Sequence, residues 1–149
     1  MRKHFDRELY NKYDTMAKAK VNELFDDTGW TIEVNEKKMG VDFLVYDEDD
    51  EHVAYLEVEV KTNWKEETFP YSDVQWPERK WKYCELDKPT IFLMFNIDLS
   101  QYLTARGETL LGSKLEMVRN KYVRYGENFF KVPVSKITFN DVYKELRDL

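Results

Sequence analysis

A chain of 149 residues with 42% hydrophobic, 15% aromatic and 35% charged side chains predicts one packed globular domain, 1–149, and excludes a disordered chain. Cys84 is the only cysteine, and His4 and His52 are the only histidines, which excludes an internal disulfide and leaves hard, oxygen-bound metals as the candidates rather than a closed zinc site. The net charge of −6 argues against a general nucleic-acid-coating protein, and the lack of an apolar leader or a run of roughly 18 apolar residues predicts an intracellular, cytoplasmic protein with no membrane partner.

The first half of the sequence predicts a helix followed by three strands. Apolar residues recur at helical spacing from Phe5 to Leu24, so residues from about 4 to 27 are expected to form an amphipathic helix that Gly29 stops. Three segments have the pattern of strands, at 30–34, 41–46 and 53–61. The acidic segment 47–51 between the last two predicts a hairpin turn.

The second half predicts a helix, a buried strand and an extension. Pro77 suits the first turn of a helix that runs to about Leu86, and the continuous apolar run 91–95 is typical of a central strand. After it we expect a polar connection, a hairpin that turns at Gly126-Glu-Asn128, and a C-terminal helix capped by Asn140. The order is α-β-β-β-α-β, with a core at about 4–96 and an extension at about 97–149.

Charged side chains share one face of the third predicted strand. Because strand residues alternate, Glu57, Glu59 and Lys61 point to one side while the apolar residues between them point to the other. On the preceding strand, Asp42 is flanked by residues that favour burial, where an unpaired carboxylate is costly. If the hairpin places Asp42 beside Glu59, the two carboxylates repel by about 1 kcal/mol in water, and by roughly 4 kcal/mol at an effective dielectric constant of 20. A divalent cation would turn that repulsion into a binding site.

The charge is unevenly distributed along the chain. Residues 21–59 carry a net charge of −11, whereas residues 1–20 carry +3 and residues 103–136 carry +4. The basic stretches can still bind a polyanion if the acidic block lies elsewhere or is neutralised by a cation.

Asp42, followed after a hairpin by Glu59-Val60-Lys61, resembles the core motif of the PD-(D/E)XK nuclease superfamily. Its restriction-endonuclease-like fold occurs in restriction enzymes, Holliday-junction resolvases and phage exonucleases. The resemblance covers residues from about 4 to 96, including the element order. It implies an α/β fold with a mixed central sheet flanked by helices, here extended by a C-terminal hairpin and helix, and the activity of a Mg²⁺- or Mn²⁺-dependent deoxyribonuclease.

The resemblance also implies a role for each motif residue. Asp42 and Glu59 would bind the metal, the backbone carbonyl of Val60 would be a further ligand, and Lys61 would orient or activate the attacking water. These residue types suit phosphodiester hydrolysis, because a carboxylate-held Mg²⁺ offsets the developing negative charge and lowers the pKa of a bound water. Lys61 would add a positive charge and a proton donor.

The chain departs from the family pattern at two places. Gly40 stands where the motif's name has a proline. Resolvase-like members also carry a glutamate on the first helix, but Lys18 and Lys20 occupy the corresponding positions here. Glu57 and Glu8 are then the remaining candidates for a third acidic ligand.

Two further segments carry candidate DNA contacts. Superfamily members often have a basic residue on the helix after the motif lysine, so Arg79, Lys80 and the nearby Tyr83 are candidates, with a plain surface helix as the alternative. The segment 62–75 is long for a loop, and its Trp64 and Lys65 could contact DNA by stacking and by charge. The alternative is that the aromatic side chains of this segment pack over the sheet.

Other interpretations of the whole chain remain open. The simplest is that the acid-x-Lys triplet is a solvated strand face, since such triplets are common by chance. A second is a catalytically inactive nucleic-acid-binding or protein-interaction module of the same fold, against which the intact Asp42, Glu59 and Lys61 argue. A third is an acidic interaction protein, such as an inhibitor or DNA mimic, which the charge block at 21–59 supports. DNA is the expected partner, and a homodimer is a further arrangement that the sequence leaves open.

Overall fold

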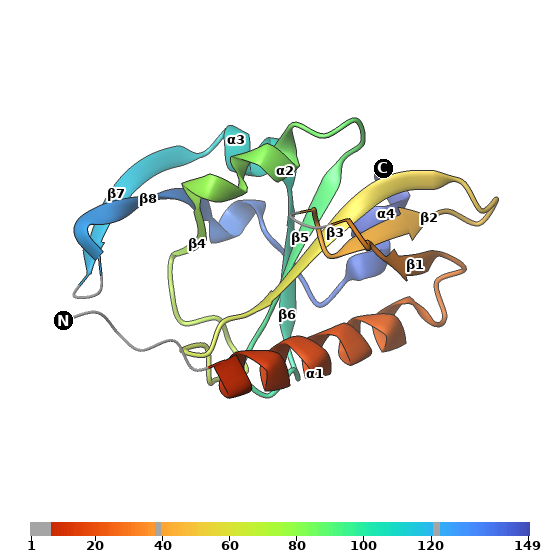
Figure 1. The fold of residues 1–149 in the computed structure, drawn as a ribbon, viewed down its shortest axis with the longest axis horizontal. Coiled ribbons are helices and arrows are strands. Elements are labelled where there is room, and N and C mark those ends of the chain that lie inside the picture. Colours follow the sequence, from red (N-terminus) through yellow and green to blue (C-terminus); the bar gives the residue numbers. More distant parts are fainter. Residues whose placement is uncertain (1–6, 38–39, 121–122) are drawn as a thin grey trace.

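Two sheets and four α-helices make up the part of the chain that the computed structural model describes, residues 7–37, 40–120 and 123–149 (Figure 1). The larger sheet has the strand order β1-β2-β3-β5-β6-β9, and the smaller sheet has the order β4-β8-β7. In chain order the elements are α1 (Arg7–Phe25), β1 (Thr31–Val34), β2 (Phe43–Tyr46), β3 (His52–Val60), β4 (Asp73–Pro77), the 3₁₀ turn η1 (Glu78–Lys80), α2 (Trp81–Cys84), β5 (Thr90–Phe95), β6 (Tyr102–Arg106), α3 (Gly107–Leu111), β7 (Lys114–Asn120), β8 (Val123–Pro133), the 3₁₀ turn η2 (Val134–Lys136), β9 (Thr138–Phe139) and α4 (Val142–Arg147).

The larger sheet mixes parallel and antiparallel pairing. β1, β2 and β3 are antiparallel neighbours, β5 pairs with β3 in parallel, and β6 and β9 continue in the antiparallel sense. All six residues of β5 are buried, as its continuous apolar run predicted for a central strand. The predictions of an α/β protein, of a mixed central sheet and of the hairpin turn between β2 and β3 are therefore confirmed.

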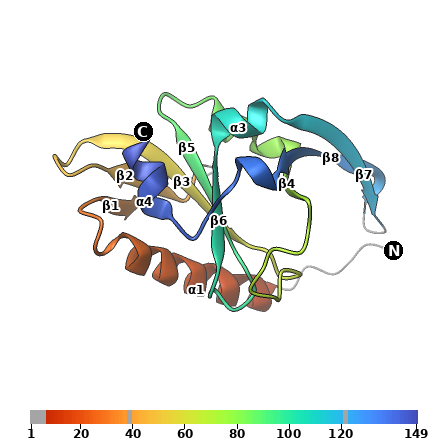
Figure 2. The same cartoon turned by 180° about the vertical axis from the view of Figure 1, so that it is seen from behind.

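Two hydrophobic cores lie on opposite faces of the larger sheet, because successive strand residues point to opposite sides. On one face, α1 and α4 pack against the sheet through side chains such as Val21, Phe25 and Leu146. On the other face lies the smaller sheet, which contributes Val74 and Trp76. Figure 2 shows α4 on the side of the molecule turned away from the viewer in Figure 1. Each fully buried aliphatic or Phe side chain stabilises the fold by about 1.5–3 kcal/mol.

The helices differ from the sequence prediction mainly at one place. α1 agrees with the helix predicted at about 4 to 27, although residues 4–6 lie outside the described part. The helix predicted from Pro77 to about Leu86 is much shorter: Pro77 ends β4, and only η1 and the four residues of α2 follow. Among the described residues, no helix is long and apolar enough to cross a membrane.

The segment predicted as the long loop 62–75 contains the start of β4. Val74 and Trp76 are buried, and the strand pairs with β8. The short apolar alternation in this strand was hidden by the polar and charged residues around it. By pairing with β8, β4 therefore connects the chain after β3 to the β7–β8 hairpin in the C-terminal half.

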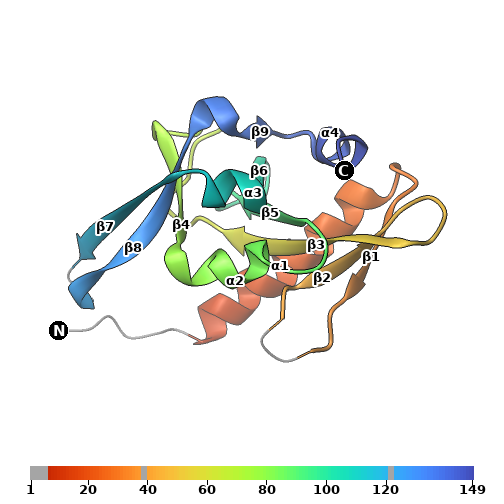
Figure 3. The same cartoon turned by 90° about the horizontal axis from the view of Figure 1, so that it is seen from above.

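The C-terminal hairpin is confirmed, but its turn was predicted in the wrong place. β7 and β8 pair from Lys114–Lys131 to Asn120–Val123, so Gly126 lies inside β8. Gly126 has a φ of 80°, and the pairing register shifts close by, so this glycine allows a bulge rather than the turn. In Figure 3 the hairpin projects from the body of the molecule.

The cap of α4 was also assigned to the wrong residue. Asp141, not Asn140, caps the helix, and its side chain accepts a hydrogen bond from the backbone N–H of Lys144 at 3.0 Å. Asn140 has a φ of 54°, and its side-chain oxygen accepts from the backbone N–H of Tyr102 at 2.9 Å. It therefore fixes the turn between β9 and α4 to the start of β6.

The positive φ of Gly126 gives a test of the bulge. Gly126→Ala should lower the free energy of unfolding by about 1–2 kcal/mol, because a side chain disfavours this backbone conformation. Gly112→Ala is the matched control: Gly112 has a φ of −83°, and an added Cβ would come no closer than 3.4 Å to Glu108 O. Urea denaturation of both variants is the measurement, and equal effects would contradict a left-handed conformation at Gly126.

Candidate functional site

The carboxylates of Asp42 and Glu57 each accept a backbone hydrogen bond at the place where β2 separates from β3. The last paired residues of the two strands at this end are Phe43 and Leu56. At the next position Asp42 Oδ2 accepts from the backbone N–H of Val58 at 2.8 Å, and the backbone N–H of Asp42 donates to Glu57 Oε1 at 3.2 Å. The two side chains thus satisfy backbone N–H groups at the place where the ladder ends.

Lys80 supplies the positive charge nearest to Glu57. Its Nζ lies 2.7 Å from Glu57 Oε2, and Glu57 is only 7% exposed. Burial, followed by the charge of Asp42, raises the pKa of Glu57 to about 7, against the opposing effect of Lys80. Burial opposes the charge of Lys80, but the hydrogen bond and charge of Glu57 outweigh it, so the pKa of Lys80 is raised. The ion pair is therefore largely shielded from water.

Glu59 lies on the same face of β3 and is buried at its carboxylate. Its Oε1 and the indole N–H of Trp76 are both inaccessible to solvent, and neither has a hydrogen bond of normal geometry among the described residues. The Trp76 indole nevertheless lies close enough to lower the pKa of Glu59 as a donor to its carboxylate. Burial raises the pKa of Glu59, while the nearby positive charges of Lys80 and Lys61 lower it. An orphaned buried carboxylate oxygen is costly, and such an atom in a native fold is a reason to look for a missing ligand.

Lys61 follows directly on the same face of the chain. Burial lowers its pKa, against the charge of Glu59. Its Nζ lies 5.4 Å from the centre of the Tyr71 ring, which is within the range of a cation–π contact. The backbone N–H of Lys61 bonds to β5 through Phe95 O, and by the alternation of strand bonding the carbonyl of Val60 points to the β2 side, beyond the paired register of β2 and β3.

The motif residues gather, but in a different register from the one expected. Asp42 lies opposite Glu57, and Glu59 is its diagonal neighbour, so the expectation of Asp42 directly beside Glu59 is wrong. The reason is that the pairing of the hairpin is set by its apolar face, where Phe43 meets Leu56. Glu57, first considered as a substitute ligand, is therefore as central as the motif residues themselves.

The described residues do not form a recognisable metal site, although the types of donor atom suit one. Among the described residues there is no group of three or more His, Cys, Asp or Glu side chains arranged to hold a metal ion. The donor types suit Mg²⁺ or Mn²⁺, because Asp42, Glu57 and Glu59 are all carboxylates. Glu59 Oε1 is also buried without a hydrogen bond of normal geometry. The side chain of Glu8, the other candidate ligand, lies outside the described residues.

The remaining candidates for DNA contact fall into different environments. Arg79 is exposed and forms an ion pair with Glu127 of β8, and Lys65 is exposed. Trp64 is fully buried in the core beneath the smaller sheet, so the packing alternative is confirmed for it, and its indole cannot stack on a base here. Tyr83 is half-buried, with Lys80 Nζ 5.6 Å from its ring centre.

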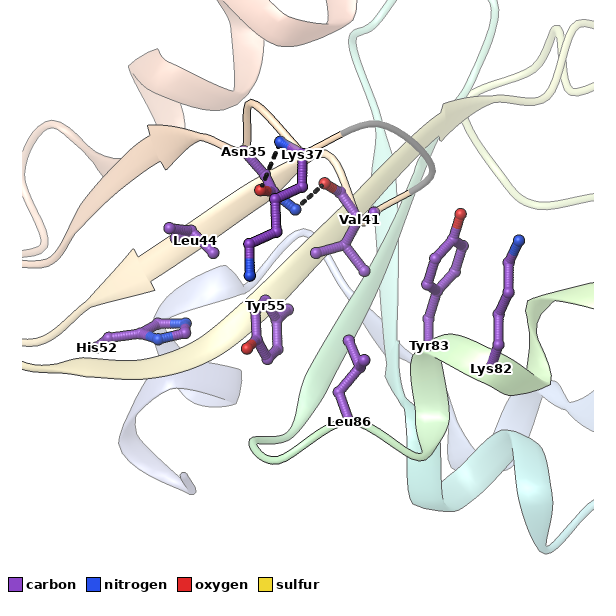
Figure 4. Close-up of a pocket in the computed structure, with 10 residues that line it drawn as sticks. Asn35, Lys37, Val41, Leu44, His52, Tyr55, Lys82, Tyr83 and Leu86 are labelled. Atoms are coloured by element: carbon purple, nitrogen blue, oxygen red, sulfur yellow. Dashed lines mark hydrogen bonds between the residues drawn. The ribbon is translucent and has the colours of Figure 1, made fainter.

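A groove of about 360 Å³ is lined by Val41, the residue before Asp42, among others (Figure 4). One wall comes from β2, β3 and the chain before β2, and the other comes from α2 and the residues after it. Sequence reasoning missed this groove, because its lining residues are scattered from Asn35 to Leu86 and only the fold brings them together. Tyr83 alone among the candidate DNA contacts lines it.

Comparison with known proteins does not place the chain in a family. No protein-family model matches the sequence, and no curated protein matches it.

The raised pKa of Glu57 predicts how stability depends on pH without metal. The ordinary pKa is 4.5, so the folded protein binds an extra proton between about pH 4.5 and pH 7. The contribution of this proton to the free energy of unfolding is therefore fully present below pH 4.5 and is lost as the pH rises through 7. In EDTA, the wild-type free energy of unfolding should fall relative to that of Glu57→Gln by on the order of 3 kcal/mol, at about 1.4 kcal/mol per pKa unit. Urea titrations between about pH 5 and pH 8 measure the slope, and parallel slopes would contradict the raised pKa.

Proposed function

We propose that this protein is a metal-dependent nuclease that hydrolyses phosphodiester bonds of DNA, with Asp42, Glu57, Glu59 and Lys61 at its centre. The observation that carries the proposal is the buried carboxylate of Glu59, whose Oε1 has no hydrogen bond of normal geometry and only the Trp76 indole as a nearby donor, within a group of acids whose charges are incompletely balanced. Strongly shifted pKa values and unsatisfied buried charge are features that cluster at functional sites.

Each side chain then has a defined role. Asp42, Glu59 and the Val60 carbonyl would hold a divalent cation, with Glu57 as a further ligand, and a bound Mg²⁺ or Mn²⁺ would supply Lewis-acid chemistry at the phosphate. Lys61, whose pKa is lowered by burial, is suited to orient the attacking water and to take up or release its proton. Lys80 would favour the ionised form of Glu57 against the effect of burial and stabilise negative charge that develops on the phosphate.

The chain order of the elements supports a PD-(D/E)XK-type nuclease. A first helix packs against a three-stranded antiparallel meander, the motif residues lie at the end of its second strand and on its third, and the next strand of the sheet, β5, runs parallel to the third. This is the α-β-β-β-α-β order that the sequence motif implies. The short α2 is the second helix of this order, and the β4 strand before it is an addition to that minimal core.

A catalytically inactive module of the same fold is the alternative, and one observation favours it. Asp42 and Glu57 already satisfy backbone N–H groups where β2 and β3 separate, and Lys80 already pairs with Glu57. These contacts alone would give Asp42 and Glu57 a structural reason to be acidic. They leave Glu59 and Lys61 unexplained, which is why we favour the nuclease.

Catalysis gives the most direct test. Asp42→Asn, Glu59→Gln and Lys61→Ala should each reduce Mg²⁺-dependent DNA cleavage by about 10²-fold or more, since each removes charge from the site but no core volume. Asp47→Asn in the β2–β3 turn and Lys136→Ala in η2 are the controls, and both should cleave at the wild-type rate.

The assay should use labelled single-stranded, duplex and branched DNA, and RNA, with and without Mg²⁺. Circular dichroism should show that each variant remains folded. Near wild-type cleavage by any two of the three site variants would show that these residues are not the catalytic site. No cleavage of any substrate by the wild type would favour the inactive module.

Metal-linked stability tests the site without a substrate. A cation that binds only the folded protein stabilises it by RT ln(1 + [L]/Kd), which is about 1.4 kcal/mol at ten times Kd and raises Tm by a few degrees. Asp42→Asn keeps an oxygen that can accept from Val58 N–H, so it should be as stable as wild type in EDTA but gain little from Mg²⁺ or Mn²⁺.

Asp47→Asn is the matched control, because it removes one carboxylate charge from the acidic turn and keeps an acceptor for Asp49 N–H. It should respond to metal like the wild type. Equal metal-induced shifts in the wild type and Asp42→Asn would mean that the ions act on general surface charge.

A further inference from the structure

The groove beside Asp42 combines apolar walls, aromatic rings and free positive charge. Val41, Leu44 and Leu86 supply aliphatic surface. Tyr55 and His52 lie together on β3, with ring centres 4.7 Å apart and the rings nearly perpendicular. Figure 4 shows Lys37 and Tyr55 toward one side of the groove and Lys82 and Tyr83 on the other. A flat ring that entered would find aromatic and aliphatic contacts from both walls.

The two lysines of the groove have no acidic partner within the described residues. Neither Lys37 nor Lys82 takes part in an ion pair there, whereas Lys80, on the preceding turn, is held by Glu57. Lys82 Nζ lies 5.2 Å from the centre of the Tyr83 ring. The acidic residue closest to the aromatic wall, Asp87, accepts a hydrogen bond from the Tyr55 hydroxyl at 2.6 Å. Unpaired ammonium groups at the rim of an apolar groove are complementary to an anionic ligand with an aromatic part.

One end of the groove lies near the carboxylates of Asp42 and Glu57, next to Val41 and Tyr83. Val41, which lines the groove, is followed directly by Asp42. Tyr83 is near both features, because it lines the groove and lies beside Lys80, and the charges of Glu57 and Asp42 contribute to the raised pKa of its hydroxyl after burial. A ligand in the groove would therefore continue into the proposed catalytic site.

We propose that this groove holds one unpaired nucleotide of a DNA strand, with its base between the walls and a phosphate at Lys37 or Lys82. A base in a duplex is stacked on both faces and exposes only its edges, so it cannot use a groove lined by ring faces and aliphatic side chains. An unpaired base exposes both faces and gains from stacking on aromatic side chains. The volume, about 360 Å³, falls at the small end of ligand pockets, which suits one nucleotide.

This inference rests on the proposed nuclease function and narrows its substrate. The preferred DNA would contain a single-stranded stretch, such as a free end, a flap or a gap, with the scissile phosphate next to the nucleotide held in the groove. A continuous duplex would present its backbone to the carboxylates without filling the groove. The same groove would serve RNA only if it tolerates a 2′-hydroxyl, which the binding experiment can resolve.

The test measures binding separately from cleavage. Tyr55→Leu/Tyr83→Leu removes both tyrosine rings of the groove but keeps side chains of similar bulk. In a Lys61→Ala background with Mg²⁺, its affinity for a short labelled oligothymidine should fall about tenfold or more, the effect expected for losing base stacking. Affinity for a blunt duplex should stay within about twofold. Tyr143→Leu on α4, where the tyrosine is exposed outside the groove, is the matched control and should bind oligothymidine normally.

The lysines provide a second variant that does not disturb packing. Lys37 and Lys82 are both exposed, so Lys37→Ala/Lys82→Ala should fold normally even if the tyrosine variant does not. For single strands, losing two phosphate contacts should reduce the slope of log affinity against log salt by up to about 1.4. Lys136→Ala/Lys144→Ala makes the same change in net charge at exposed positions of η2 and α4 and should leave the slope unchanged.

Three results separate this inference from the proposed function. Weaker single-strand binding by the groove variants, with slower cleavage of flap or single-stranded substrates, supports both. Normal single-strand binding by both groove variants, in a protein that cleaves DNA, overturns the groove and leaves the nuclease standing. Groove-dependent binding without cleavage of any DNA supports the nucleotide site and overturns the nuclease. An oligoribothymidine of the same length, tested alongside, shows whether the groove selects DNA.

Discussion

The site depends on the way the β2–β3 ladder ends. Backbone N–H groups just beyond the end of a ladder commonly bond to water, and Asp42 and Val58 lie just beyond the last pair of β2 and β3, Phe43 and Leu56. Instead, the strands separate and the carboxylates of Asp42 and Glu57 satisfy those N–H groups. This fixes both carboxylates in a partly buried place, where the negative charge of one makes ionisation of the other less favourable.

The smaller sheet makes that place low in dielectric and brings in the compensating charge. β4 packs Trp76 over the face of β3 that carries the acids, and the chain leaves β4 through Pro77 into η1, which holds Lys80. The pairing of β4 with β8 therefore positions the lysine that neutralises Glu57. A protein with only the larger sheet would leave this face open to water, where the same acids would have ordinary pKa values and little reason to bind a cation.

The sequence predicted the elements with strong patterns and failed where the pattern was short. α1, the β1–β3 meander and β5 follow from helical spacing, alternation and a continuous apolar run. β4 could not be predicted, because its two inward residues, Val74 and Trp76, give too brief an alternation and its partner β8 lies far along the chain. The turn at Gly126 was wrong because a glycine with positive φ serves a bulge as well as a turn.

The site was predictable as a set of residues but not as a geometry. Alternation along β3 correctly put Glu57, Glu59 and Lys61 on one face. Which of them meets Asp42 depends on the hairpin register, and a shift by two positions keeps every side chain on its face, so the pattern alone does not decide it. Lys80 could be named as basic and near the motif, but its pairing with Glu57 depends on β4, which the sequence did not reveal.

The balance of charge at the site argues for a divalent cation over a purely structural role. Asp42, Glu57 and Glu59 bring three negative charges when ionised, while Lys61 and Lys80 bring two positive charges, and Arg79 is engaged by Glu127 at the surface. A phosphodiester that approached this group would add one more negative charge and meet net repulsion in a low-dielectric setting. One divalent cation would restore neutrality with the phosphate bound. Glu59 Oε1 is the atom at which an oxygen-seeking ion would gain most, because it is buried, has no hydrogen bond of normal geometry, and has only the Trp76 indole as a nearby donor.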